Sequence, residues 1–400
     1  MPVNRNVERQ SSNQEYFLQP LNKCGKIIKS CTNSYHKEDP DMHIERSNRI
    51  LKELKALGAD QLLITDPMSI YYLTDAYVQP FERFFGLLLR SDGQHILFLN
   101  RLFFVPQETG TEKVWYSDTD PVMEIVARYL DAAKPLAVDK DLKARHLLPL
   151  MESHAAAGFL NGSLAVDRTR GIKDAEEQKK MIAASLINDA AMARFKTLVH
   201  EGVTEQEIAA QMLDIYRELG ADGYSFTPLV AFGANAADPH HEPDNTIVKP
   251  GDCVLFDVGC IKDGYCSDMT RTFFFREASD HCRHIYNIVR RANEAAEALI
   301  RPGVQLSELD AAARDLITAE GYGPQFNHRL GHFIGLSEHE FGDVSSASDW
   351  QAEPGMIFSI EPGIYLSGDT GVRLEDLVLV TEDGVQILNR YPHELEIIDG

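Results

Sequence analysis

Two long apolar segments, each interrupted by a turn signal with an acidic residue in the apolar run on either side of it, constrain this chain more than any other feature. The first, CVLFDVGCIKDGYCSDMTRTFFF, places Asp257 and Asp268 on either side of Lys-Asp-Gly. The second, GMIFSIEPGIYLSGDTGVRLEDLVLV, places Glu361 and Glu375 on either side of Ser-Gly-Asp-Thr-Gly. If each segment reverses at its turn, its two acids lie opposite or diagonal on adjacent antiparallel strands, with Cβ atoms about 5–8 Å apart.

Carboxylates that face each other in apolar strands lose hydration and repel one another, so the fold must compensate them. Taken alone, each Asp could be a turn residue capped by backbone N–H groups, and Glu375 could form a surface ion pair with Arg373. Two matched hairpins with two acids each favour instead a cation that the acids share. The repetition also predicts internal symmetry, with two similar β units that bring four carboxylates to one place.

A histidine-rich segment, NHRLGHFIGLSEHE, lies between the two acidic hairpins and contains His328, His332 and His339. Gly331 and Gly335 flank the central histidine and allow the backbone to approach its neighbours closely. A lone histidine is more often structural than a ligand. Three of them in one apolar run punctuated by glycine favour a functional site.

Four carboxylates and one imidazole form an oxygen-rich ligand set, which suits Mn²⁺, Co²⁺, Fe²⁺ or Zn²⁺ and does not suit Cu⁺ or an iron–sulfur cluster. Four negative charges balance two divalent cations. Two cations about 3.5–4 Å apart can activate water and polarise a carbonyl group. The residues alone therefore predict a dinuclear metal-dependent hydrolase, and they leave its substrate open.

The overall composition excludes several classes of protein. The net charge of −22 disfavours nucleic acid and anionic membranes as partners, because their phosphates would be repelled. We find no apolar run of about 18 residues, which a membrane helix needs, and the N-terminus lacks the apolar core of a secretory signal. Six scattered cysteines without a CxxC pair predict reduced thiols and a cytoplasmic location. We interpret Cys260 and Cys266 as small buried fillers whose oxidation would disturb the nearby acids.

The chain divides into three parts by pattern. Residues 1–41 are polar and predict a flexible extension, whereas residues 42–165 alternate helical and strand patterns, with a hairpin signal at SDGQ, and predict an α/β domain. Residues 166–400 predict an α+β domain with a mostly antiparallel sheet. It opens with a long helix over 171–202, and helices near 280–300 and 306–320 interrupt its strands. Thr204 and Glu207 form the signature of a helix capping box.

The motifs FDVG, SDMTRT, GHFIG, SIEPG and RLED, in this order, resemble those of the pita-bread metallopeptidases, which include methionine aminopeptidase, aminopeptidase P, prolidase and the metal-free creatinase. The resemblance covers the chain from about Met42 to its end. It implies an α+β protein with a creatinase-like, pita-bread catalytic domain of pseudo-twofold β units, preceded by a smaller α/β domain. That first domain, with LLITDPMSIYYLTDA, points to the prolidase and aminopeptidase P branch.

The resemblance also implies a set of metal ligands, with Asp268 and Glu375 bridging the ions and Glu361 also taking a proton from water. These ligands are Asp257, Asp268, His332, Glu361 and Glu375. Because the ligand set is complete, the resemblance argues against creatinase itself. GHFIG departs from the commoner Gly-His-Gly form at Phe333, which the flanking glycines should tolerate.

Around the metal ligands, the resemblance implies an outer ring of substrate-binding and catalytic groups. His240, rather than His241, and His339 would steady the substrate carbonyl and the tetrahedral intermediate. His328 would line the pocket for proline, and Arg373 and Tyr365 would organise the substrate side of the site.

The implied function is hydrolysis of Xaa-Pro bonds in dipeptides or short peptides, carried out by a homodimer with two divalent metal ions, manganese before cobalt, zinc or iron. One alternative is an Xaa-Pro aminopeptidase that acts on longer peptides. Another is a related metal-dependent hydrolase or lyase of a different small amide or zwitterion. A non-catalytic binding homologue is the least favoured alternative, because such relatives usually lose metal ligands.

Overall fold

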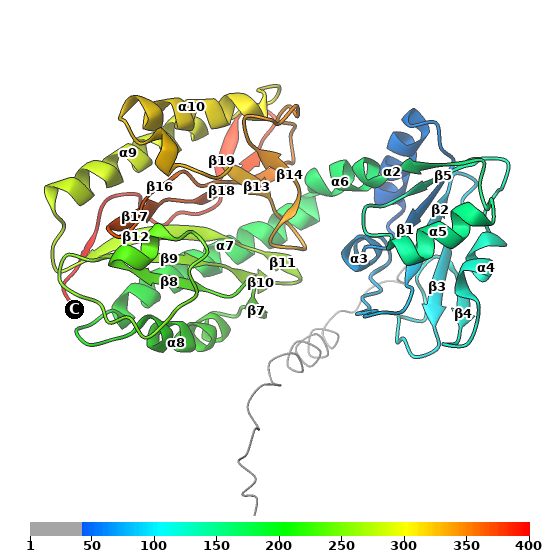
Figure 1. The fold of residues 1–400 in the computed structure, drawn as a ribbon, viewed down its shortest axis with the longest axis horizontal. Coiled ribbons are helices and arrows are strands. Elements are labelled where there is room, and N and C mark those ends of the chain that lie inside the picture. The colour runs from blue at the N-terminus through cyan, green and yellow to red at the C-terminus, as the bar shows by residue number, and fades with distance from the viewer. Residues whose placement is uncertain (1–41) are drawn as a thin grey trace, which may run out of the picture. The chain divides into compact units, whose positions relative to one another are not determined.

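The structure, a computed structural model, describes residues 42–400 (Figure 1). The extension predicted over residues 1–41 lies outside the described residues. A six-stranded sheet forms the N-terminal part, and four further sheets form the C-terminal part. The predicted boundary near residue 165 falls within α6 (Ser163–Gly171), and the domain limits stay a prediction. In the described part of the chain, no helix is long and apolar enough to cross a membrane.

The N-terminal sheet has the strand order β4-β3-β2-β1-β5-β6 and mixes parallel and antiparallel pairs. Its strands are β1 (Gln61–Ile64), β2 (Gly86–Arg90), β3 (Ile96–Asn100), β4 (Glu112–Tyr116), β5 (Pro135–Val138) and β6 (Gly158–Asn161). The predicted hairpin is confirmed as the antiparallel pair of β2 and β3. We did not predict β6, because GFLN is too short to show an alternating pattern.

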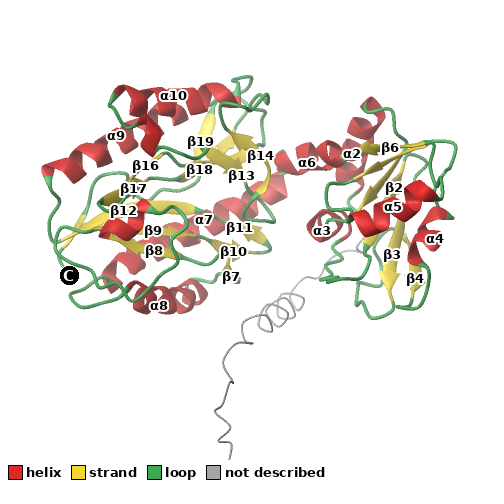
Figure 2. Ribbon diagram, in the orientation of Figure 1, coloured by secondary structure: helices red, strands yellow, loops and turns green. Residues whose placement is uncertain are grey.

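Helices cover both faces of this sheet (Figure 2). They are α2 (Ile44–Ala56), α3 (Pro67–Thr74), α4 (Val122–Ala127), α5 (Ala144–Glu152) and α6. Within β1, Leu62 and Ile64 pack in one core with residues of α2, α3 and α6, while Leu63 packs in another core with residues of α4 and α5. This alternation is what a strand buried on both faces requires.

The C-terminal part begins with α7 (Ala175–Phe195) and α8 (Glu205–Glu218). The helix predicted over 171–202 starts later than expected, because Asp174 caps α7 in a reciprocal capping box with Glu177. The helix also stops before Gly202, in a short 3₁₀ turn, η1 (Lys196–Leu198). The predicted capping box of Thr204 and Glu207 at the start of α8 is confirmed.

Two similar β units follow, each preceded by a pair of helices, as the paired acidic hairpins predict. The first unit is β9 (Cys253–Val258), β10 (Cys260–Lys262), β11 (Tyr265–Cys266) and β12 (Met269–Phe275). The second is β15 (Ile357–Ile360), β16 (Gly363–Leu366), β17 (Thr370–Arg373) and β18 (Asp376–Val380), after α9 (Asp280–Glu297) and α10 (Leu306–Ala319). In each unit the outer strands pair antiparallel, and the inner strands form a smaller hairpin.

The remaining elements extend these two units into sheets with the orders β20-β12-β9-β8 and β14-β13-β15-β18-β19. The added strands are β8 (Leu229–Phe232), β13 (Gly331–Phe333), β14 (Glu340–Val344), β19 (Val385–Ile387) and β20 (Ile397–Ile398). β7 (Gly223–Tyr224) instead pairs with β10 in the sheet β11-β10-β7. Two 3₁₀ turns, η2 (Gly233–Ala237) and η3 (Gly323–Gln325), complete the part. Its strand pairs are antiparallel except for β12 with β20, which confirms the predicted, mostly antiparallel sheet.

The pleat of β9 decides where its acid points. Val254 and Phe256 pack in a core with residues of α7 and α8, whereas Cys253 and Leu255 pack in a different core with residues of α9 and of the second β unit. Asp257 continues the alternation of Leu255, so its carboxylate faces the second unit.

Candidate metal centre

The first pair of acids lies on the predicted hairpin. Asp257 is inside β9 opposite Thr270 of β12, and Asp268 directly precedes β12. The chain reverses at Asp263 and Gly264, whose φ values of 50° and 83° are those of a two-residue hairpin turn with left-handed central residues. The predicted antiparallel hairpin is confirmed. Asp257 lies inside one of its strands, and Asp268 lies just before the start of the other.

The second pair of acids lies at the ends of strands rather than inside them. Glu361 directly follows β15 and Glu375 directly precedes β18, at the point where Ile360 pairs with Asp376. Pro362 has no N–H to continue the ladder, so the chain leaves β15 there and forms the separate β16–β17 hairpin. The two glutamates therefore occupy the break between two strand pairs.

His332 brings the third component into the same place. Its Nε2 atom lies 3.5 Å from Glu361 Oε1, 3.7 Å from Asp268 Oδ2 and 4.0 Å from Glu375 Oε1. A Cβ atom on Gly331 would lie 1.8 Å from the Ser359 carbonyl oxygen, so only glycine lets β13 approach β15 this closely. The Ser359 hydroxyl then accepts the His332 N–H at 2.9 Å and donates to Glu361 Oε1 at 3.1 Å.

This cluster fits a divalent cation. Ligand atoms of Asp268, His332 and Glu375 all lie within 4.8 Å of one another, and all three side chains are buried. Among the described residues, the buried atoms Asp257 Oδ1 and Asp268 Oδ1 have no hydrogen-bond partner. Unpaired carboxylate oxygens at such burial are costly, and a cation would satisfy them.

The pKa values of the acids also favour a bound cation at this cluster. Burial, followed by the charges of the neighbouring carboxylates, raises the pKa of Asp268 and of Glu375 well above the usual range. Burial also raises the pKa of Glu361 to about 7, although Arg373 opposes that shift. Burial lowers the pKa of His332 to about 3, which keeps the imidazole neutral. A neutral imidazole and acids that lose protons when a cation binds are what a metal site requires.

Arg373 is buried beside the cluster and joins both β units. It donates to Asp257 Oδ2 at 2.5 Å, to Thr270 Oγ1 at 3.0 Å and to the Tyr365 hydroxyl at 2.9 Å. The alternative in which Glu375 pairs with Arg373 is wrong, since Glu375 Oε2 accepts the Thr270 hydroxyl at 2.7 Å. Thr270 escaped the sequence analysis, although its position opposite Asp257 follows from the hairpin register.

His328 and Tyr365 extend this chain of polar contacts, since Nε2 of His328 lies 2.9 Å from the Tyr365 hydroxyl. Burial, together with Arg373, lowers the pKa of His328 to about 4. His339 lies on the other side, with its ring centroid 4.1 Å from that of His332 in an edge-to-face arrangement. The structure thus brings both predicted histidines to the metal cluster, and their roles toward a substrate stay predictions.

His240 and His241 differ in what they contact. The ring of His241 lies 2.7 Å from the buried Glu205 carboxylate. In the described part of the chain, the ring of His240 takes no hydrogen bond. Burial is the main cause of the lowered pKa values of His328 and His339, and His240 adds to both. These contacts agree with the choice of His240 as the histidine near the site.

Glu205, His241 and Asp244 form a second cluster with metal-ligating atoms. The Glu205 carboxylate already accepts the backbone N–H groups of Phe232 and Asp244 and the Asn235 amide, at 2.8 to 3.0 Å. Because its oxygens are satisfied, we interpret this cluster as a clamp that holds the loop carrying His240.

Arg329 is a functional candidate that the sequence analysis missed. Its charge contributes to the lowered pKa of His339, after burial, and of His332. Its guanidinium forms no hydrogen bond or ion pair with any described residue. The only signal in the sequence was its position between His328 and the metal ligand His332.

Cys260 and Cys266 are buried and free, as fillers should be. Burial raises the pKa of Cys260 to about 12 and that of Cys266 well above its usual value, so neither thiol ionises readily. Low ionisation makes both thiols poor targets for oxidants, which weakens the interpretation that oxidation would disturb the site.

Comparison with known proteins covers most of the chain. Residues 46–172 match the creatinase/prolidase N-terminal domain, and residues 179–382 match metallopeptidase family M24. An uncharacterized peptidase of Staphylococcus aureus is 37% identical over 355 residues, covering 86% of this chain and 98% of the relative.

Two solved structures are similar over their full length. The dipeptidase PepE from Mycobacterium ulcerans is 32% identical with a TM-score of 0.84, covering 90% of this chain and 98% of that one. The Xaa-Pro dipeptidase from Bacillus anthracis is 31% identical with a TM-score of 0.80, covering 88% and 99%. With its buried cluster of acids and histidine, this chain belongs to metallopeptidase family M24 and carries the family's creatinase-type N-terminal domain.

Proposed function

We propose that this metallopeptidase is a prolidase that hydrolyses Xaa-Pro dipeptides with two divalent cations, manganese first among them. The observation that carries the proposal is the convergence of three carboxylates on one neutral imidazole, with the fourth, Asp257, held by Arg373. Beside them runs the polar chain of Arg373, Tyr365 and His328. The similar solved structures named dipeptidase and Xaa-Pro dipeptidase support it.

The proposed ligands of the cations are Asp257, Asp268, His332, Glu361 and Glu375. Bound cations supply Lewis-acid chemistry, which makes a water molecule nucleophilic and a peptide carbonyl electrophilic. Arg373 holds Asp257, and Thr270 holds Glu375, so that both carboxylates keep their direction while a substrate enters. Fixed second partners of this kind tune the ligands that they hold.

Glu361 is the proposed proton carrier. Its carboxylate, held by the Ser359 hydroxyl at 3.1 Å, is proposed to accept a proton from the attacking water and to pass it to the departing proline nitrogen. His339 and His240 are proposed to donate hydrogen bonds to the carbonyl oxygen as negative charge develops on it. Burial lowers the pKa of His339, so the ring is neutral and keeps one N–H for that purpose.

Arg329 supports the dipeptide form of the proposal. In a dipeptide, the proline carboxylate lies close to the scissile bond, whereas in a longer peptide an amide takes its place. A guanidinium without a partner in the described part of the chain, next to His328, offers that carboxylate a charged donor. In a longer peptide, a neutral amide at that place would attract the guanidinium less strongly.

The decisive experiment is cleavage of Ala-Pro, Ala-Pro-Ala and Ala-Ala by protein stripped with a chelator and then reloaded with each metal. We expect Mn²⁺ to restore cleavage of Ala-Pro, with little cleavage of Ala-Ala. Stronger cleavage of Ala-Pro-Ala would select the aminopeptidase instead. Protein that binds metal and cleaves none of the three would contradict the peptidase specificity proposed here. Light scattering of the same sample tests the proposed homodimer. The proposed location of the protein is the cytoplasm.

A further inference from the structure

Glu340, which directly follows His339, carries a buried charge that the proposed chemistry does not use. One of its oxygens, Oε1, accepts the Arg170 guanidinium at 2.7 Å and the Leu336 N–H at 3.0 Å. The other, Oε2, lies 3.2 Å from Lys173 Nζ. The side chains of all three charged residues are 9% exposed or less, so this is an ion cluster inside the protein.

The segment that carries His339 is wrapped around this carboxylate. A Cβ atom on Gly335 would lie 2.8 Å from Glu340 Oε1, so only glycine permits the carboxylate to sit there. Gly335 in turn donates to the Ser337 carbonyl at 3.0 Å and accepts the Cys266 N–H at 2.8 Å. The segment between Gly335 and Glu340 is thus fixed at both ends, and one attachment lies two residues before the acid Asp268.

The cations come from a distant part of the chain. Arg170 lies in the last turn of α6, and its Nη1 atom donates to Asp66 Oδ2 at 2.8 Å and to the Ser69 hydroxyl at 3.0 Å. Asp66 itself caps α3 of the N-terminal sheet domain. Glu340 therefore connects the His339 segment, through a single guanidinium, to the start of a helix in the first domain.

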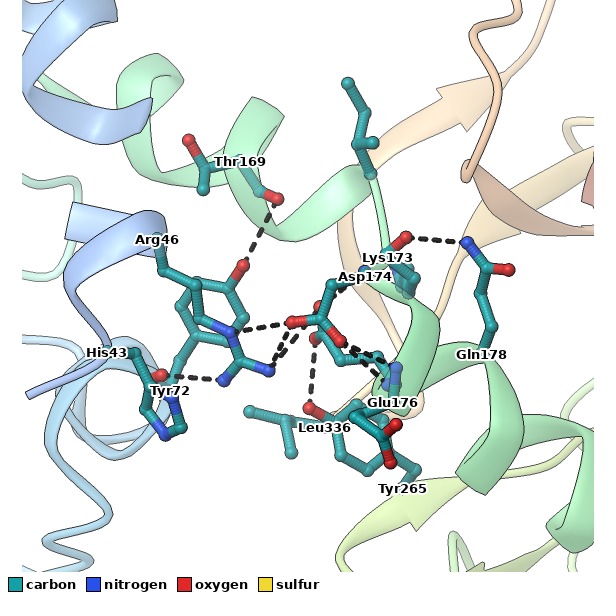
Figure 3. Close-up of polar contacts among 12 residues, drawn as sticks. His43, Arg46, Tyr72, Thr169, Lys173, Asp174, Glu176, Gln178, Tyr265 and Leu336 are labelled. Atoms are coloured by element: carbon teal, nitrogen blue, oxygen red, sulfur yellow. Dashed lines mark hydrogen bonds and ion pairs between the residues drawn. The ribbon is translucent and has the colours of Figure 1, made fainter. Parts of the chain in front are cut away.

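Lys173 is held in a short connection that has its own contacts. Its backbone N–H donates to the Gly355 carbonyl at 2.8 Å, and its carbonyl accepts the Gln178 amide at 2.8 Å. Figure 3 shows the contacts on either side of it, where Arg46 donates to Asp174 at 2.8 Å and the Gln178 amide meets the Lys173 carbonyl. The ammonium that neutralises Glu340 is therefore fixed in place rather than mobile.

Electrostatics favour a permanently charged Glu340. Burial alone would raise the pKa of the carboxyl, but the charges of Arg170 and then Lys173 lower it to about 2. Replacing the carboxylate would leave the buried Lys173 ammonium without its counter-charge and Arg170 with Asp66 alone, which is unfavourable. Burying three charged side chains costs free energy, which points to a function for the cluster. Glu340 directly follows His339 in the chain.

We propose that Glu340, together with Arg170 and Lys173, is a positioning residue for His339. The buried carboxylate fixes the backbone between Gly335 and Glu340 so that the His339 ring stays against His332, 4.1 Å away between centroids. The kinetic part of this inference rests on the proposed function of His339. The structural part, that Glu340 anchors the segment, does not.

The test compares Glu340→Gln with wild type, both loaded with Mn²⁺ and assayed on Ala-Pro. Glutamine keeps the shape and removes the charge. We expect unchanged metal content, a KM within twofold of wild type and a kcat lowered about tenfold, because only the orientation of His339 changes. Glu340→Asp keeps the charge on a shorter arm, and we expect it to recover part of the lost kcat.

A double-mutant cycle separates positioning from a general structural defect. In a His339→Ala background, Glu340→Gln should lower kcat by less than twofold, since the residue it positions is absent. An equal tenfold loss in both backgrounds would overturn the proposal. Asp174→Asn is the matched control: it removes the ion pair with Arg46 in the same connection, keeps a helix cap, and should leave kcat within twofold. A tenfold loss there would also overturn it.

Amide hydrogen exchange tests the anchoring without any assay of activity. Glu340→Gln should exchange faster over residues 334–344, with α9 as the unchanged reference. If wild type cleaves no Xaa-Pro peptide, the proposed function fails while this comparison still decides the anchoring, and unchanged exchange would refute it. Should Glu340→Gln fail to fold, Lys173→Met removes one cation only, and the same local increase is expected.

Discussion

Thr270 illustrates how much of the candidate centre depends on single uncharged groups. Its hydroxyl accepts from Arg373 and donates to Glu375, so one oxygen fixes the direction of two charged side chains from different strands. We expect Thr270→Val to lower kcat/KM about 10–100-fold, the usual effect of losing a partner of a metal ligand. Thr270→Ser keeps the hydroxyl and should retain most activity. An equal loss in Thr270→Ser, which keeps the hydroxyl, would show that these hydrogen bonds do not by themselves account for the effect.

The acids themselves give a more severe prediction. Asp268 is buried, and its Oδ1 atom has no described partner, so Asp268→Asn removes a carboxylate oxygen that the proposed cation would bind. We expect metal content to fall and kcat/KM to drop by more than about 100-fold. Normal turnover in this variant, with metal measured in the same sample, would mean that the metal centre has been placed wrongly.

The pKa of Glu361 predicts how metal affinity depends on pH. Because that pKa is raised to about 7, protons compete with cations for the carboxylate below pH 7 and cease to compete above it. Mn²⁺ should therefore bind more tightly as the pH rises from about 6 to 8, with release of protons. Titration calorimetry in buffers of different ionisation enthalpy measures that release. Affinity that is independent of pH would exclude Glu361 as a ligand.

At the scale of elements, Gly331 sets how closely β13 and β15 pack. In Gly331→Ala the new Cβ would meet the Ser359 carbonyl at 1.8 Å, so β13 must move and take His332 with it. We expect a loss of roughly 3 kcal/mol in the free energy of unfolding, at the upper end for overpacking, together with weaker metal binding. Gly384→Ala, where a Cβ meets nothing within 4 Å, is the control and should change stability by less than about 0.5 kcal/mol.

The elements also show where prediction from sequence succeeds and where it stops. The hairpin of β9 and β12 follows from two apolar runs around a turn, because register fixes which residues face each other. The second hairpin was placed less accurately, because Pro362 ends β15 and the apolar pattern runs on without a visible break. α7 began later than its periodicity suggested, since Asp174 is a better cap than any residue before it. The ligand set needed only local patterns, whereas the partners Thr270 and Ser359 depend on register between strands.

At the scale of the whole molecule, local sequence patterns do not predict which distant charged residues form ion pairs. Arg170 and Glu340 are 170 residues apart, and no periodicity links them. The same holds for Arg46 and Asp174, 128 residues apart. Such pairs arise only when separately patterned segments pack together, so no local pattern predicts them. The net charge of −22, in contrast, could be read directly.

Metal removal should be visible in the stability of the whole molecule. A cation that binds only the folded state stabilises it by about 2.7 kcal/mol at one hundred times its Kd. A chelator should therefore lower Tm by roughly 5–10 °C, given the usual dependence of Tm on stability for domains of this size. Asp268→Asn should show no such shift on adding Mn²⁺. If chelator leaves the Tm of wild type unchanged, the buried acids are neutralised by protons rather than by metal.

The ion cluster of Glu340 has a consequence for modularity. The part that matches the metallopeptidase family begins at residue 179, yet both cations that neutralise Glu340 lie before that point. A catalytic module cut or transplanted at the family boundary would carry a buried, uncompensated negative charge one residue from His339. The boundary of the sequence family therefore does not coincide with the boundary of a structural unit that contains its own counter-charges. Any recombination between relatives has to exchange residues 170–173 together with Glu340.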